Sequence, residues 1–251
     1  MPLFRPRCPV EDRERTWIEE NITWLRGQFG DEPLNAPVIL PTREYFPPPF
    51  SGSDGDVRAA VRLVARYMGV REDVVVQFSD DFDHAENLMR LIPGGMVRTS
   101  GAAGEYTEAD VDRRPVLTID RSSASEPARL LAVIAHELGH VRLLGERRIT
   151  ASRKDQEPLT DLATVYLGMG IFTANAAFDF GRLPGYGYQR IGGWQARRLG
   201  YMTEQMFGYA LAIYADLRGQ PEPPWTRYLD TNPRVYMEHG TRYLRASHKV
   251  H

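Results

Sequence analysis

The chain has one cysteine, Cys8, among its 251 residues. A single cysteine cannot form an intramolecular disulfide, and it excludes a metal site built from several thiolates. Charge of one sign is not in excess either, because 31 basic residues stand against 33 acidic ones. A nearly neutral chain has no general electrostatic attraction for nucleic acid or for an anionic membrane, so we expect neither as a partner.

Long hydrophobic runs are also lacking. The most apolar stretch, residues 130–144, is interrupted by two histidines, a glutamate and an arginine, so it is too short and too polar to cross a bilayer. The first ten residues include Arg5 and Arg7 but no apolar core after them, which is unlike a signal peptide. These features predict a soluble protein of the cytoplasm.

Apolar periodicity and helix-end signals predict a chain rich in helices. The expected helices cover residues 11–29, 56–68, 126–144, 155–177, 203–218 and 232–244. Short β-type runs predict strands at 74–78 and 116–119, with a further short strand at 38–40. We therefore expect an α+β fold in which helices pack on a small sheet.

Three segments lack a regular apolar pattern. Residues 31–53 are rich in proline, and we expect an extended segment on the surface, with a proline-rich ligand for a partner as the alternative. Glycine is frequent in residues 94–104, which we expect to form a turn region. It is also frequent in residues 181–193, which we expect to form a loop.

The motif His136-Glu137-Leu138-Gly139-His140 lies within the helix expected at 126–144. Residues four apart share a helix face, so both imidazoles can reach one ion, and neutral imidazole is a good zinc ligand. Glu137 stands beside the first histidine, where it can take a proton from a metal-activated water. The surrounding residues are apolar on nearly every side, so the helix should be buried. The motif predicts one zinc ion per chain, against the alternative of a core helix with ordinary hydrogen-bonded histidines.

A catalytic zinc needs a third protein ligand. Glu157 and Asp161 lie four residues apart at the start of the next expected helix, and they therefore share a face. We expect Glu157 to bind the ion and Asp161 to accept the ring N–H of a ligating histidine, with Asp161 as the alternative ligand. Both acids could instead serve only as favourable charges at a helix N-terminus. Glu146 stands where a metzincin-type extension has its ligand, but Leu143 replaces the glycine of that pattern, which argues against Glu146.

The motif of residues 136–140, followed by Glu157, Asp161 and Ala163, resembles that of gluzincin-type zinc metallopeptidases. Its layout is nearest to the ImmA/IrrE-like group, in which a glycine-containing stretch and a short strand precede the motif helix. The corresponding segments here are residues 101–106 and 116–119.

The resemblance covers about residues 101–175 and implies a zincin-like fold, with a zinc-dependent peptidase acting on a protein or peptide. On this reading residues 101–251 form the catalytic region with its C-terminal helices, and residues 1–100 form an accessory lobe packed on it. The chain departs from the group at Pro158 and Thr160, and its sequence shows no helix-turn-helix.

A peptidase of this kind also uses an edge strand for the extended substrate and a donor that stabilises the transition state. Residues 116–119 are the expected edge strand. Tyr186, Tyr188 and Arg190, in the glycine-rich loop, are candidate donors, against the alternative that the tyrosines merely pack on the body of the protein.

The expected function is hydrolysis of a peptide bond in an intracellular protein or peptide, with Glu137 as the general base. One alternative is a regulatory protein that holds zinc structurally, for which a fourth ligand such as Asp155 or Glu146 would be required. Another is an interaction protein that docks a partner through its proline-rich and glycine-rich segments. A third retains hydrolysis but acts as an amidase on a non-peptide substrate. The sequence does not indicate the oligomeric state.

Overall fold

The computed structural model describes residues 6–79, 98–101, 104–107, 114–180 and 202–248. Its helices are α1 (Asp12–Phe29), α2 (Glu32–Asn35), α3 (Asp54–Tyr67), α4 (Pro127–His140), α5 (Gln156–Tyr166), α6 (Gly170–Phe180), α7 (Glu204–Leu217) and α8 (Thr231–His248). Its strands are β1 (Val75–Ser79), β2 (Arg98–Gly101), β3 (Gly104–Thr107) and β4 (Val116–Asp120). The predicted helix-rich α+β class is confirmed.

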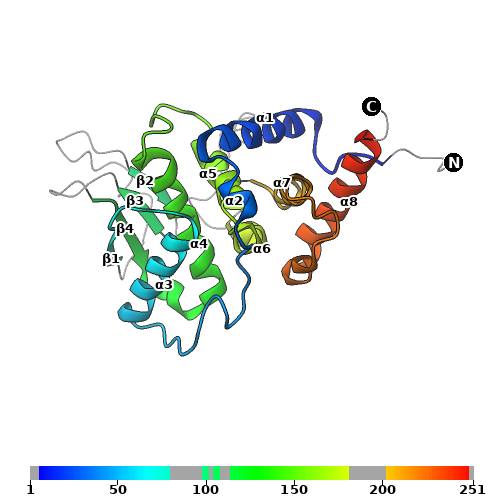
Figure 1. Cartoon of the computed structure of the whole chain (residues 1–251). Helices are drawn as coiled ribbons and strands as arrows, with labels where there is room; N and C mark the ends of the chain where they lie inside the picture. The colour runs from blue at the N-terminus through cyan, green and yellow to red at the C-terminus, as the bar shows by residue number, and fades with distance from the viewer. Residues whose placement is uncertain (1–5, 80–97, 102–103, 108–113, 181–201, 249–251) are drawn as a thin grey trace, which may run out of the picture.

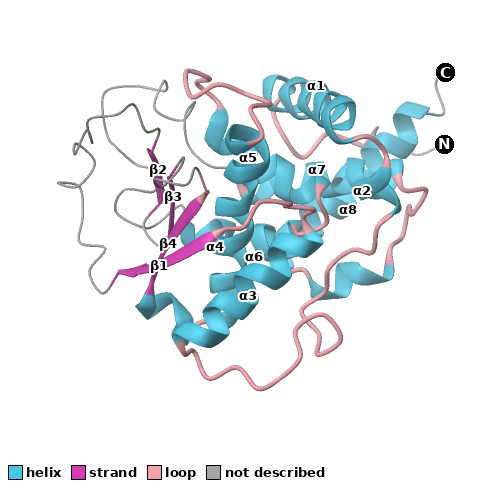
Figure 2. Cartoon of the chain, turned by 60° about the vertical axis from the view of Figure 1, so that its left-hand side comes forward, coloured by secondary structure: helices cyan, strands magenta, loops and turns pink. Residues whose placement is uncertain are grey.

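The sheet lies at one side of the molecule and has the strand order β1-β4-β3-β2 (Figures 1 and 2). β1 pairs with β4 in parallel, with Val75 opposite Val116, whereas β3 is antiparallel both to β4 and to β2. β4 is therefore an interior strand, and the prediction that residues 116–119 form an edge strand is wrong. Leu117 and Ile119, which share one face of β4, are fully buried, so this face of the sheet is covered by the rest of the fold.

Helix α4 is the centre of the fold. Every residue from Leu130 to His140 is buried, because α4 packs against α3, α5, α6 and β3. This confirms the expectation from its apolar surroundings, and each buried leucine or isoleucine there contributes roughly 1.5–3 kcal/mol of transfer free energy. The chain does not leave the helix axis at His140 but continues into a π-helical turn, η3 (Val141–Gly145).

The N-terminal part of the chain packs onto this centre. A capping box of Glu11 and Glu14 begins α1, which lies against α5 and α7, and α3 lies against α4. The predicted division at residue 100 falls within β2, and β1 from before it is hydrogen-bonded to β4 from after it. Residues on both sides of the division thus share one sheet.

Three local predictions differ from the structure. Residues 38–40 form no strand, because the Ile39 N–H donates to the Gly168 carbonyl instead of to a ladder, and α2 forms within the segment expected to be extended. The helix expected at 155–177 is two helices, α5 and α6, since Gly168 adopts φ +87° between them. The described residues of the turn region expected at 94–104 belong to β2 and β3.

The remaining helix and strand predictions are confirmed to within a few residues. The structure caps α7 with Thr203, the first residue of the predicted range, whose hydroxyl accepts the Met206 N–H. α8 begins at Thr231, one residue before the predicted start, and extends to His248. Among the described residues, no helix combines the length and the apolar character that crossing a membrane requires.

Helices α7 and α8 cross in close contact at the side of the molecule opposite the sheet (Figure 1). A Cβ at Gly208 would lie 2.4 Å from the Tyr236 Cβ and 2.8 Å from the Met237 nitrogen. Gly208 is therefore required by packing, although glycine inside a helix costs about 1 kcal/mol relative to alanine.

We predict that Gly208→Ala lowers the free energy of unfolding by about 1–3 kcal/mol, because the added methyl group forces α7 and α8 apart. Gly27→Ala, at an exposed position of α1 where a Cβ meets nothing within 4 Å, should instead raise it by up to about 1 kcal/mol. Urea unfolding of both variants measures this contrast, and equal effects of the two substitutions would contradict it.

Candidate metal centre

His136 and His140 lie one turn apart near the C-terminal end of α4, where both side chains are buried. Their rings are nearly perpendicular, at 85°, and the two Nε2 atoms are 3.2 Å apart. The helical spacing predicted from the motif therefore brings both ring nitrogens to one point.

Glu157, in the first turn of α5, presents a carboxylate oxygen to the same point. Its Oε2 is 3.2 Å from His136 Nε2 and 3.4 Å from His140 Nε2. Within the described part of the chain, these three side chains form the one group of histidine, cysteine or acidic residues placed to hold a metal ion. The Glu157 side chain remains 22% exposed, whereas the histidines are 5% exposed or less, so the point is reached from the Glu157 side.

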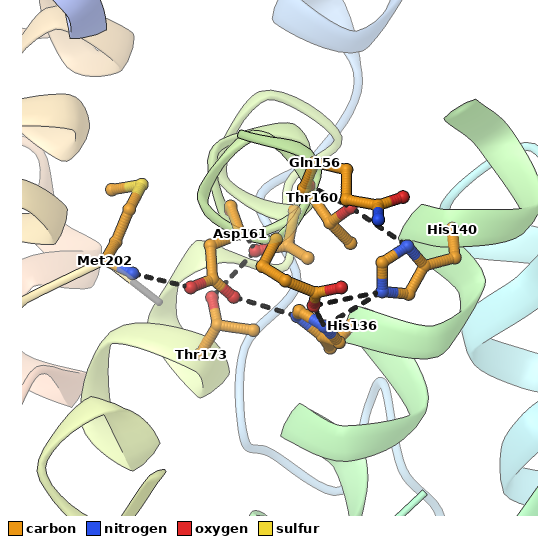
Figure 3. Close-up of polar contacts among 9 residues, drawn as sticks. His136, His140, Gln156, Thr160, Asp161, Thr173 and Met202 are labelled. Atoms are coloured by element: carbon orange, nitrogen blue, oxygen red, sulfur yellow. Dashed lines mark hydrogen bonds and ion pairs between the residues drawn. The ribbon is translucent and has the colours of Figure 1, made fainter. Parts of the chain in front are cut away.

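Asp161 determines which ring nitrogen of His136 carries a hydrogen. Its Oδ1 is 2.9 Å from His136 Nδ1, and its Oδ2 accepts the Met202 backbone N–H at 2.9 Å (Figure 3). A carboxylate only accepts, so Nδ1 carries the hydrogen and the lone pair of the neutral ring is on Nε2. Asp161 thus lies behind the histidine, and Glu157 is the acid that faces both Nε2 atoms.

Thr160 fixes the proton on His140 in the same way. The Thr160 hydroxyl donates to the Gln156 carbonyl at 2.8 Å, and its oxygen is 3.2 Å from His140 Nδ1 (Figure 3). Because the hydroxyl hydrogen is already used, Thr160 accepts from Nδ1, and the lone pair of His140 is also on Nε2.

Two imidazole lone pairs and one carboxylate oxygen therefore converge within hydrogen-bond distance of each other. Such a cluster repels itself unless a cation, either a proton or a metal ion, lies between the atoms. Tetrahedral zinc ligands at about 2.0–2.1 Å from the ion are roughly 3.3–3.4 Å apart, close to the three separations found here. The donor set fits a zinc ion in its chemistry and in its spacing.

The pKa values of the three groups reflect this convergence. Burial opposes the charged form of His136, but hydrogen bonds to Asp161 and Glu157 raise its pKa well above the ordinary value. Burial lowers the pKa of His140. Burial also opposes the ionised form of Glu157, but the adjacent His140 and His136 lower its pKa strongly. The raised pKa of His136 and the lowered pKa of Glu157 both favour an ion pair between these two groups.

Gly139 allows α5 to come this close. A Cβ at Gly139 would lie 2.7 Å from Thr160 Cγ2 and 3.4 Å from the Thr160 carbonyl oxygen. Thr160 is β-branched, and its hydroxyl contacts His140 Nδ1. It cannot move aside without losing that hydrogen bond. The glycine within the motif therefore sets the distance between the two helices that carry the three side chains.

Glu137 follows His136 on α4 and is 2% exposed. Its charge contributes to the raised pKa of His136, after the larger effects of Asp161 and Glu157. The predicted base is thus buried beside the predicted ligands.

The two residues considered as a fourth ligand are engaged elsewhere. Glu146 forms ion pairs with Arg142 and Arg148. Asp155 accepts from the Trp17 indole at 2.8 Å and pairs with Arg153. Neither belongs to the group that faces the Nε2 atoms, so among the described residues the centre has three side-chain donors.

Asp155 also links α5 to α1. Trp17 of α1 reaches Asp155 directly, and Arg153, which pairs with Asp155, donates to Asn21 of α1 at 2.7 Å. The segment that leads into Glu157 is therefore held by α1.

Two residues of the site were not foreseen from the sequence. In the sequence Thr160 is only a departure from the family pattern. Its position four residues after Gln156, however, allows the hydroxyl to donate to the Gln156 carbonyl. Gln156 itself extends toward the ring of His140 (Figure 3), and its buried Oε1 has no hydrogen-bond partner in the described part of the chain. The candidate donors Tyr186, Tyr188 and Arg190 lie outside the described residues.

We predict that Thr160→Val weakens zinc binding by about 10–100-fold, because His140 loses the acceptor that fixes its ring. Thr164→Val is the matched control, since Thr164 is also buried on α5 but donates to the Asp161 carbonyl and contacts no ligand ring. Competition with a chromophoric chelator measures both affinities. Equal affinities of the two variants would contradict the assigned role of Thr160.

We also predict that Gly139→Ala weakens zinc binding, because the methyl group pushes Thr160 and α5 away from α4. Gly27→Ala, in α1, adds the same methyl group where nothing obstructs it and should leave the affinity unchanged. The same chelator competition measures both affinities. An undiminished zinc affinity of Gly139→Ala would show that the position of α5 relative to α4 does not depend on this contact.

Comparison of the whole chain with protein-family models, with curated proteins and with solved structures gives no match. The assignment of a function therefore depends on the side chains of this centre. Their geometry identifies a three-donor candidate site for a divalent metal ion.

Proposed function

We propose that the chain is a zinc-dependent hydrolase of the zincin type that cleaves peptide bonds. The observation that carries this proposal is the convergence of His136, His140 and Glu157 on one point, with Glu137 buried next to it. Two imidazoles and one carboxylate are a donor set known from catalytic zinc sites.

The arrangement of helices supports the zincin type. The motif helix α4 lies between a mixed sheet and the helix that brings the third donor, α5. The order of strand, motif helix and following helix resembles that of the gluzincin-type metallopeptidases. In this chain these elements are β4, α4 and α5.

The number of donors favours catalysis over a structural role. Structural zinc sites are closed by four protein ligands, whereas catalytic sites have three and keep one position for water or substrate. In the described part of the chain the centre has three, since Glu146 and Asp155 are paired with arginines. An acid in the position of Glu137 is expected of a catalytic site, where it serves as a general base, whereas a structural site does not require one.

In this mechanism His136, His140 and Glu157 would hold the ion. When bound, zinc lowers the pKa of a water molecule and polarises the carbonyl of the substrate. Glu137 would serve as the general base toward water and would return the proton to the leaving amine. Asp161 and Thr160 keep each ring in the tautomer that exposes Nε2, so the donors are oriented before the ion arrives.

The first test is the zinc content of tag-free protein. We predict about one zinc per chain in the wild type and loss of that zinc in His136→Ala, since removal of one of three donors opens the site. His239→Ala, an exposed histidine on α8, is the matched control and should retain the metal. Elemental analysis gives the stoichiometry. Metal-free protein that takes up no zinc on addition would overturn both the site and the function.

The second test of this proposal separates binding from chemistry. Glu137→Gln should retain zinc but lose hydrolysis of a peptide library by a factor of about 10²–10⁴, because the amide cannot accept the proton. Glu238→Gln, exposed on α8, should retain both properties. Products identified by mass spectrometry define the cleaved bond, and unchanged activity of Glu137→Gln would refute the assigned base.

A further inference from the structure

A cavity of about 270 Å³ lies away from the metal centre, between the segment after α2, the C-terminal end of α7 and the 3-10 turn η5 (Pro224–Tyr228). Apolar side chains, among them Val38, Leu40 and Trp225, form its walls. No residue of α4 or α5 lines it. Its size is close to the lower end of the range of small-molecule sites, about 300–1,000 Å³.

Two arginines line this apolar cavity, Arg218 and Arg227. Arg218 donates to the carbonyls of Pro33 and Leu34 and, through Nε, to Gln220 Oε1 at 3.4 Å. Arg227 donates to the Tyr228 hydroxyl at 3.0 Å and lies 4.9 Å from the centre of that ring. All of these acceptors are neutral.

Neither guanidinium is paired with a carboxylate in the part of the chain that the structure describes. Other arginines of the chain, such as Arg26, Arg121 and Arg153, do have acidic partners. Arg227 is exposed and Arg218 is half-buried, so water can reach this cavity. It combines apolar walls with two guanidinium groups that have no acidic partner among the described residues, which is complementary to an anion with an apolar body.

The walls are held in place by contacts to the rest of the fold. Asn175 of α6 donates to the Tyr228 carbonyl and accepts the Asp230 N–H, both at 2.9 Å. The Trp225 indole donates to Gln220 Oε1, and Trp225 is 5% exposed. A ligand would thus meet a formed site rather than one that must be ordered on binding.

We infer that this cavity binds an apolar monocarboxylate, whose carboxylate pairs with Arg227 and Arg218 and whose body packs against Trp225 and Leu40. The same chemistry is present in a free small organic acid and in the C-terminal residue of a peptide. The site is independent of the proposed hydrolase activity.

Calorimetric titration with benzoate and with 3-methylbutanoate tests the inference, each against its neutral amide. Both acids should bind at one site per chain, and each amide should bind at least about tenfold more weakly because the charge-assisted hydrogen bonds are lost. N-acetyl-Ala-Leu with a free or an amidated C-terminus forms a further arm. Tighter binding of this peptide acid than of the small acids would identify a peptide terminus as the ligand, and the reverse order would identify a free acid.

Two variants locate the site. Arg227→Gln should weaken benzoate binding about tenfold, whereas Arg242→Gln, exposed on α8 and away from the cavity, should not. Glu137→Gln should bind benzoate like the wild type, which separates this site from the metal centre. Absence of saturable binding by both acids, equal binding of the amides, or an undiminished affinity of Arg227→Gln would overturn the inference.

Discussion

At Gly139 the backbone of α4 lies against Thr160 of α5 with no side chain between them. The three donors come from these two helices, two from α4 and one from α5, so their separation is set by this contact. A single methyl group on Gly139 would be larger than the space available. Glycine lowers the intrinsic stability of the helix, but it permits the close approach that leaves 3.2–3.4 Å between the donor atoms.

The histidines are oriented by two short hydrogen-bond chains, and both chains end on the backbone. One runs from His136 through Asp161 to the Met202 N–H, and the other runs from His140 through Thr160 to the Gln156 carbonyl. Backbone groups do not titrate and cannot rotate away, so each ring is given a fixed tautomer. Each Nδ1 atom therefore has a hydrogen-bond acceptor, although the helix that carries the two histidines is buried on every face.

Much of this could be predicted from the sequence, and the reasons differ from residue to residue. The i, i+4 spacing of His136 and His140 determines their common face because it depends on helix geometry alone. The separation of α5 from α6 depends on Gly168, whose positive φ is set by tertiary contacts that the apolar pattern does not reveal. The interior place of β4 depends on β1, a strand distant in sequence, and Thr160 acquires its role from a helix crossing. The apolar pattern of one sequence does not predict which distant segments pair with each other.

The attachment of α5 to α1 through Asp155 and Arg153 has a consequence for the order of assembly. Trp17 and Asp155 are separated by 138 positions, so their contact closes one of the longest loops in the described fold. Contacts of high sequence separation carry a large entropic cost and form late in folding. Helix α1 precedes α5 in the chain, but this entropic cost predicts that the two are joined after contacts of shorter sequence separation have formed. Until that contact forms, the start of α5, which carries Glu157, lacks the hydrogen bonds that attach it to α1.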